Sequence, residues 1–410
     1  MKNAKTIIIS LLIVVMAFVF VGFSAAEQAV HEPVTIAVAM ATVSNEYVRM
    51  QDYLSKYLGP ALNIDFIFSS QLNSTEEFVA FIENAYTAGA AGLVDLAVSN
   101  TINAETIDAK CAEYGMPYST WSAGSYKALE NRQGVLAGGI GSDMAIVQEA
   151  AYNWTKGIFT GEGDLNLVIF SVVAFMGNAQ QYPAIVGFMN AIRENYGLDI
   201  SDEEISAFAL SDTNVTYSNG SNVNIVNMPG APGFIGDWDT NGTVLEEGSY
   251  DKIIIAGDTY GRFMETIDRY EEMLNRDFTV YGLASINDAF YNGFNTLDRF
   301  GNPKLDSVLL KTGTAGVFAT AVLLNEMYGD DDVLGDHGVF PLDYAPVYGA
   351  DGYNAVGMID TAEEYYAVTV DEFKSMIKYY TPDLDYETFY KLVPTLSSAK
   401  NIVERRGIQN

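Results

Sequence analysis

Short apolar runs of strand length alternate with amphipathic helical segments along most of this chain. The first unit predicts strands at 35–41, 64–68, 92–98 and 117–121, with helices beginning at Asn45, Thr75 and Ala104. The dipeptide Gly59-Pro60 is predicted to end the first of these helices. This alternation indicates an α/β fold in which helices cover both faces of a parallel sheet.

The same alternation of strand-length and helical segments begins again at Leu165. The second unit predicts strands at 165–173, 252–256 and 278–283, and helices at 182–196, 261–274 and 289–299. We therefore expect two Rossmann-like lobes with parallel sheets, linked by a hinge, and a C-terminal helical extension. The predicted domains are 27–143 for the N-terminal lobe (completed by about 312–335), 144–311 for the C-terminal lobe and 336–410 for the extension.

Three crossings between the lobes are predicted, near Ser142 to Ala145, at Ala284 to Asp288 or earlier, and at Lys311 to Gly316. Two polar segments have weaker patterns. Leu210 to Gly242 is expected to be a loop with one short strand near Asn224 to Asn227, and Leu334 to Gly357 is expected to be a loop. Within the extension, Val370 to Arg406 has a helical pattern.

The N-terminal residues 1–26 have the pattern of a secretory signal peptide. Lys2 and Lys5 precede an apolar run from Ile7 to Phe23, and Ser24-Ala25-Ala26 supplies the small residues of a cleavage site. We predict cleavage before Glu27 and a secreted or periplasmic mature protein, with an uncleaved membrane anchor as the alternative.

Composition excludes several classes of function. The net charge of -31, from 22 basic and 53 acidic residues, repels nucleic acid and anionic lipid surfaces. His31 and His337, the only histidines, are predicted in solvated loops, and Cys111, the only cysteine, in a helix as a small buried residue. This argues against His-based hydrolases and His-ligated metal sites, so no metal and no cofactor is predicted. Carboxylate-based catalysis stays possible.

Candidate ligand-binding residues follow from a rule for doubly wound sheets, in which ligands bind beyond the carboxyl ends of the strands. The residues selected are Asn45, Tyr47, Asn100, Trp121, Gln181, Tyr182, Asp258, Asn287 and Asp288. Amides, hydroxyls, carboxylates and aromatic rings together suit a neutral polyhydroxylated ligand. The competing interpretation of each residue is structural: Asn45, Asp258 and Asp288 as helix caps and Trp121 as core.

Four segments carry a resemblance to a known family: Ser44-Asn45-Glu46-Tyr47-Val48, Ile140-Gly141-Ser142-Asp143, Gly236-Asp237-Trp238-Asp239 and Ile254-Ile255-Ala256-Gly257-Asp258. From about Val34 to Tyr328 the chain resembles the type I periplasmic substrate-binding proteins of the ribose- and galactose-binding kind. The resemblance implies that Trp238 lies against the ligand. The chain departs from the family where Tyr182 replaces an Arg, Gly282-Leu283-Ala284 replaces Gly-Phe-Asp, and Lys311 replaces a Gln at the final crossing.

The sequence therefore predicts a non-enzymatic, monomeric, extracytoplasmic binding protein. The expected ligand is a small polar molecule, a monosaccharide in the first place, captured between the lobes for the membrane subunits of an ABC transporter. One alternative is a ligand-sensing receptor for a nucleoside, an amino-acid-like compound or a signalling molecule. An alternative of another class is a secreted carbohydrate-active enzyme that uses paired carboxylates such as Asp258 and Asp288.

Overall fold

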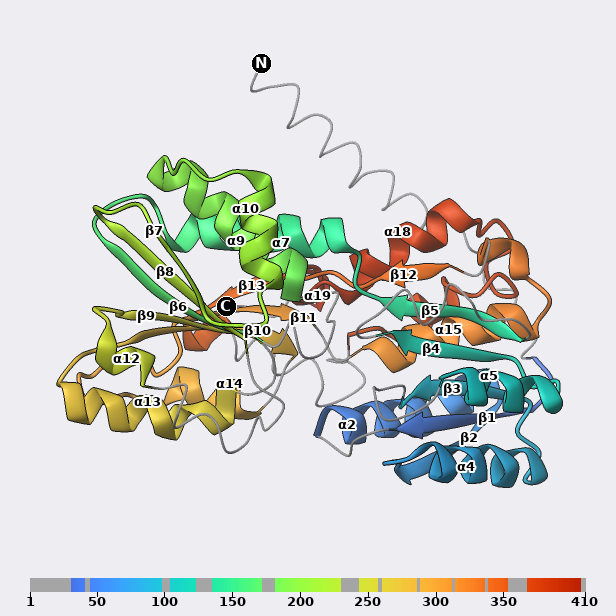
Figure 1. The fold of residues 1–410 in the computed structure, drawn as a ribbon. Helices are drawn as coiled ribbons and strands as arrows, with labels where there is room; N and C mark the ends of the chain where they lie inside the picture. The colour runs from blue at the N-terminus through green and yellow to red at the C-terminus, as the bar shows by residue number, and fades with distance from the viewer. Residues whose placement is uncertain are drawn as a thin grey trace, which may run out of the picture.

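The computed structural model describes residues 31–40, 45–97, 104–122, 135–171, 181–229, 243–256, 260–285, 288–311, 314–335, 338–352 and 367–406. Figure 1 shows two lobes side by side, each built on its own sheet. The first lobe has a six-stranded parallel sheet in the order β12-β5-β4-β3-β1-β2. Its strands are β1 (Val34–Met40), β2 (Ile64–Gln71), β3 (Gly92–Leu96), β4 (Tyr118–Ser122), β5 (Leu136–Gly141) and β12 (Val339–Pro341).

The second lobe has a seven-stranded sheet in the order β13-β11-β10-β9-β6-β8-β7. Its strands are β6 (Leu165–Ser171), β7 (Val215–Ser218), β8 (Val223–Pro229), β9 (Lys252–Ala256), β10 (Thr279–Ser285), β11 (Ser307–Lys311) and β13 (Ala345–Tyr348). The edge strands β7 and β13 run antiparallel to their neighbours, and the strands between them are parallel. The predicted architecture of two parallel α/β units is confirmed.

Helices cover both faces of the first sheet, because its strands are apolar on both sides. On one face, Ala37 and Ala39 of β1 pack with Phe78 of α4 (Thr75–Thr87) and Cys111 of α5 (Ala104–Glu113). Cys111 is buried, as predicted. On the other face lie α2 (Asn45–Tyr53) and α15 (Ala315–Met327), and α15 packs across β3, β4 and β5.

The second sheet is covered in the same way, and the alternation along β6 shows it. Leu167 and Ile169 face α7 (Met144–Ile158), α9 (Gln181–Tyr196) and α10 (Asp202–Leu210), whereas Val168 and Phe170 face α13 (Tyr260–Leu274) and α14 (Asp288–Asn295). The one-turn helix α12 (Val244–Glu247) precedes β9. Figure 1 places α7, α9 and α10 above this sheet and α13 and α14 below it.

The chain passes from the first lobe to the second between β5 and α7, and it returns between β11 and α15, where the sequence analysis places two crossings. The crossing predicted at Ala284 to Asp288 is wrong, because β10 and β11 are neighbours in one sheet and α14 packs against α13. A third crossing lies instead between Pro341 and Ala345, where β12 ends and β13 begins.

Three further local expectations are corrected. The first helix does not end at Gly59-Pro60: a π-helical turn (Leu54–Leu58) leads into α3 (Gly59–Leu62), whose first turn accepts Pro60 because it needs no N–H donor there. The segment 210–242 holds the hairpin of β7 and β8 rather than one strand. The segment 334–357, expected to be a loop, contains β12 and β13.

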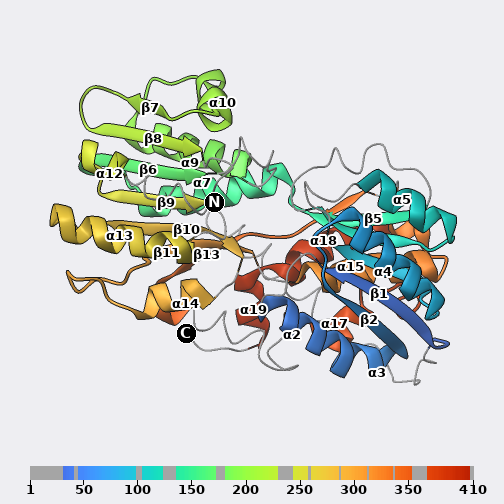
Figure 2. The ribbon, with the colours of Figure 1, turned by 60° about the horizontal axis from the view of Figure 1, so that its bottom comes forward.

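The C-terminal segment is helical, as predicted, in α17 (Val370–Lys374), α18 (Tyr386–Ser397) and α19 (Ala399–Arg406). It packs against the first lobe: α18 contacts β12, and the Phe340 and Phe389 rings lie edge to face with centroids 4.6 Å apart. Figures 1 and 2 both place α19 near the middle of the molecule. His31, predicted to be solvated, is partly exposed, and its ring also stacks on Tyr328 with a centroid distance of 3.9 Å.

Within the part of the chain described above, no helix combines the length and the apolar character that a membrane crossing needs.

Gly187 lets α7 and α9 approach closely, and this contact supplies the first prediction. A Cβ at position 187 would lie 2.4 Å from the Gln148 carbonyl oxygen and 2.9 Å from the Ala151 Cβ. Gly187→Ala is therefore expected to lower the free energy of unfolding by about 1–3 kcal/mol, because backbone atoms of α7 must shift. Gly338→Ala is the matched control, since a Cβ there meets no atom within 4 Å. Urea unfolding followed by circular dichroism compares the two, and equal stabilities would contradict the close packing.

Candidate functional site

The carboxyl ends of one strand from each sheet meet where Trp121, near the end of β4, contacts Lys311, at the end of β11. We call this contact the lobe junction. The Lys311 Nζ lies 4.3 Å from the centroid of the Trp121 ring. A cation at this distance from a tryptophan face makes an attractive cation–π contact. Trp121 is 9% exposed, so the junction is already closely packed.

A buried carboxylate, that of Asp95, lies on β3, which pairs with β4 in the first sheet. Asp95 is 0% exposed, its Oδ1 accepts the Ala97 N–H at 2.9 Å, and its Oδ2 accepts the Thr120 hydroxyl at 3.3 Å. These bonds tie the end of β3 to β4 and set the direction in which the chain leaves β3. The sequence analysis missed Asp95. The available signal was a charge inside an otherwise apolar strand, which is costly unless the group is hydrogen-bonded.

The second lobe carries a comparable set of buried polar groups below its strand ends. Gln181, at the start of α9, donates its Nε2–H to the Ala256 carbonyl at the end of β9, at 3.1 Å. Ser171 at the end of β6 donates to the Asn227 Oδ1 at 2.9 Å, and Asn227 donates to the Phe208 carbonyl at 2.9 Å. These amides hold α9 and α10 in place against the carboxyl ends of β6, β8 and β9.

Two of the segments that join the lobes are bonded to each other. The Ser142 Oγ, just after β5, lies 2.9 Å from the Tyr344 hydroxyl, just before β13. Both residues are buried, at 2% and 4% exposure. Because each residue sits where the chain passes from one sheet to the other, this hydrogen bond couples two of the connecting segments beside the junction.

Comparison with known proteins adds the family context. No protein-family model and no curated protein matches the sequence. Solved structures do match. A periplasmic solute-binding protein of an ABC transporter from Actinobacillus succinogenes 130z, with bound D-allose, aligns with a TM-score of 0.55 at 16% identity and covers 79% of this chain and 99% of its own. A solute-binding protein of an ABC transporter from Bacillus halodurans C-125, with bound myo-inositol, aligns with a TM-score of 0.54 at 14% identity and covers 80% and 98%.

The chain has the type I periplasmic binding protein fold. This fold also matches a transcription regulator of Lactococcus lactis, with a TM-score of 0.50, 12% identity and coverage of 78% and 99%. The periplasmic binding protein fold therefore does not by itself decide what a chain binds; the side chains at the site do.

Within this fold, five predicted ligand residues have described side chains. The structure joins Trp121 and Lys311 at the lobe junction and places Gln181 at the end of β9. Tyr47 is half-buried in α2 and packs against the core of the first lobe. Asn45 and Asp288 begin α2 and α14, but their side chains lie outside the described residues, as do Asn100, Trp238, Asp258 and Asn287 altogether. The ligand-binding roles of all these residues stay predictions.

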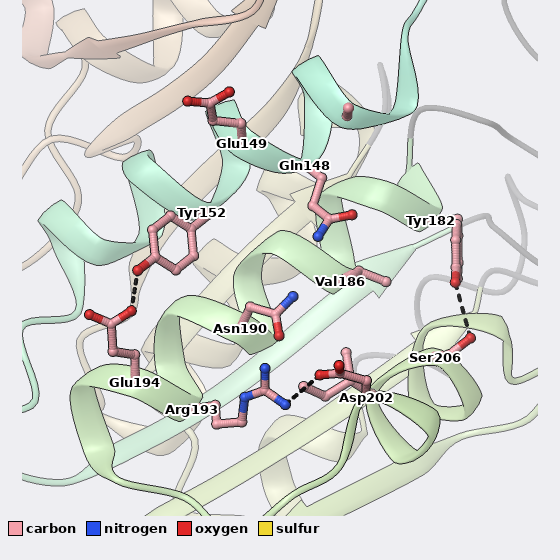
Figure 3. A pocket seen from close by; sticks show the side chains of 12 residues that line it. Gln148, Glu149, Tyr152, Tyr182, Val186, Asn190, Arg193, Glu194, Asp202 and Ser206 are labelled. Carbon is pink, nitrogen blue, oxygen red and sulfur yellow. Dashed lines mark hydrogen bonds and ion pairs between the residues drawn. The ribbon is translucent and has the colours of Figure 1, made fainter.

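Tyr182, the fifth, contacts α10. Its hydroxyl lies 3.0 Å from the Ser206 Oγ of α10, and its side chain lines a groove of about 920 Å³ between α7, α9 and α10 (Figure 3). Two ion pairs lie among the polar groups of this groove. Arg193 contacts Asp202 at 2.6 Å. Lys156 and Tyr152 donate to Glu194 and thereby hold the pKa of its carboxyl below the ordinary value.

Proposed function

We propose that this protein is an extracytoplasmic solute-binding protein that captures a monosaccharide or a similar polyol at the lobe junction and delivers it to an ABC transporter. The observation that carries the proposal is the contact of Trp121 with Lys311 across the two sheets. An aromatic face suits the apolar side of a sugar ring, and an ammonium group offers three donors to vicinal hydroxyls. A ligand held between these side chains touches both lobes and stabilises their closed arrangement.

Several features support this proposal over its alternatives. The structures with bound D-allose and myo-inositol share the fold, and both of their ligands are neutral and polyhydroxylated. The net charge of -31 disfavours nucleic-acid binding, because clustered basic groups are what attract phosphates. The predicted signal peptide at 1–26 accords with a site outside the cytoplasm. Capture for transport leaves the ligand chemically unchanged.

A thermal-shift screen of the purified protein against sugars, polyols, nucleosides and amino acids tests the proposal. A ligand at about 100 times its dissociation constant stabilises the folded state by roughly 2.7 kcal/mol. We expect a sugar or a polyol to raise the melting temperature and to be recovered intact, as measured by mass spectrometry after incubation. A response confined to nucleosides or amino acids would overturn the ligand class, and sustained conversion of the ligand would overturn the binding-only role.

A further inference from the structure

Three carboxylates converge near the amino ends of β10 and β11, at the end of the second sheet opposite to the lobe junction. Glu271 lies in the last turn of α13, Asp277 in the turn that leads into β10, and Asp298 in the connection from α14 to β11. One carboxylate oxygen of each lies within 4.8 Å of the others. The chain thus brings three acidic groups from three segments to one point, although like charges repel.

The buried oxygens of this cluster are poorly supplied with hydrogen-bond donors. Glu271 is 3% exposed, and among the described residues its carboxylate accepts only the Phe278 N–H, at a long 3.4 Å. The Asp298 Oδ2 is buried without a partner. A buried carboxylate oxygen in this state costs free energy unless another group compensates it.

The outward oxygens, in contrast, are fixed. The Asp298 Oδ1 accepts the N–H groups of Phe300 and Asn302 at 2.7 and 2.9 Å. The Asn302 Nδ2 donates to the Asp277 Oδ2 at 2.7 Å. These bonds orient Asp277 and Asp298 and leave their remaining oxygens for a further partner.

No basic side chain in the described part of the chain forms an ion pair with these three carboxylates. Lys304 pairs with Asp268 at 2.6 Å, and Arg299 donates to the backbone carbonyl of Glu271 at 3.2 Å. A cavity of about 420 Å³, which Glu271 and Asp298 line, adjoins the cluster and has room for an ion with several waters.

We propose that Glu271, Asp277 and Asp298 bind a calcium ion. Carboxylate oxygens are the ligands that Ca²⁺ prefers, and its six to eight ligands in flexible geometry would be completed by water from the adjoining cavity. Mg²⁺ demands a near-ideal octahedron and gives up its waters reluctantly, so it fits a site of three protein carboxylates less well. The ion ties the end of α13 to the connection between α14 and β11 and so stabilises the second lobe.

The test is calcium titration of the full chain after dialysis against a chelator. Calcium sites of extracellular modules have dissociation constants on the order of 10⁻⁴ to 10⁻³ M. At about 10 mM CaCl₂ we expect the melting temperature to rise by roughly 2–4 °C above a sodium chloride control of equal ionic strength. Absence of this rise, or an equal rise with MgCl₂, would overturn the assignment.

Matched variants locate the site. Glu271→Gln and Asp298→Asn are expected to weaken calcium binding at least 10-fold, as measured by calorimetry. Glu271→Gln should fold without the metal at least as stably as the parent, because it removes a buried charge. Glu272→Gln is the control, since Glu272 is exposed on the same helix and lines the same cavity outside the cluster. Calcium binding that is equal in Glu271→Gln and Glu272→Gln would place the ion elsewhere and contradict the proposal.

Discussion

Replacing Trp154 with alanine is expected to lower the free energy of unfolding by about 3–5 kcal/mol, the usual range for a fully buried aromatic side chain. Trp154 is 0% exposed on α7, and its ring lies against Phe188 of α9 and Tyr281 of β10, with centroids 5.6 and 6.2 Å away. Its Nε1–H donates to the buried Ser307 Oγ of β11 at 3.0 Å. The substitution therefore leaves both a cavity and a buried hydroxyl that has lost its donor.

Unfolding in urea, followed by circular dichroism, measures this loss. Tyr291→Ala is the control, because Tyr291 is 50% exposed on α14 and its truncation is expected to change stability by less than about 0.5 kcal/mol. Trp154→Phe separates the ring from the N–H group and should fall between the two. If Trp154→Ala were as stable as Tyr291→Ala, the docking of α7 on the second sheet would be wrong.

The strands of the second lobe show how well the local sequence pattern predicts the bounds of strands. The strand predicted at 252–256 has the observed bounds of β9, and β10 differs from prediction by two residues or fewer at each end. β6 begins at the predicted residue, Leu165, and the last two residues predicted for it, 172–173, lie outside the described residues. These strands are buried on both faces, so they are continuous apolar runs bounded by turn residues. Such an apolar run can be recognised as a strand from the sequence alone, without knowing which strands lie beside it.

The elements that were missed depend on partners far away in the sequence. β12 has only three residues, Val339–Pro341, and pairs with β5, about two hundred residues earlier. Its residues are apolar, but the run is too short to be recognised as a strand without its pairing to β5. The misplaced crossing has the same origin, because the pattern around Ala284 does not tell whether the next strand joins the same sheet.

In the candidate site, too, single residues could be predicted from the sequence, but the contacts between them could not. The strand-end rule selected Trp121 from its position alone, and the family resemblance singled out Lys311. No local pattern shows that these two side chains contact each other across two sheets. The cluster of Glu271, Asp277 and Asp298 is likewise a product of tertiary structure, and the expectation of no metal site considered histidine and cysteine spacing rather than carboxylates from three segments.

Replacing Trp121 with alanine is expected to weaken ligand binding by about 2–4 kcal/mol, or roughly 30- to 700-fold, the effect of truncating a central aromatic contact. Trp121 supplies the ring surface at the junction, and its loss also removes the ring that the Lys311 ammonium contacts. Lys311→Met keeps the length of the side chain and removes its charge, so it should weaken binding less, by about 10-fold. Calorimetry with the sugar found in the screen measures both.

Tryptophan fluorescence separates a binding role for Trp121 from a purely structural one. The chain has three tryptophans, and Trp154 is 0% exposed in the second lobe, so Trp154→Phe should preserve both the affinity and the change in emission on ligand binding. Trp121→Phe should keep the fold but reduce that change, because the ring that meets the ligand no longer emits as tryptophan. If Trp121→Ala retained the parental affinity with an unchanged circular dichroism spectrum, Trp121 would be a core residue of the first lobe and the ligand would bind away from the lobe junction.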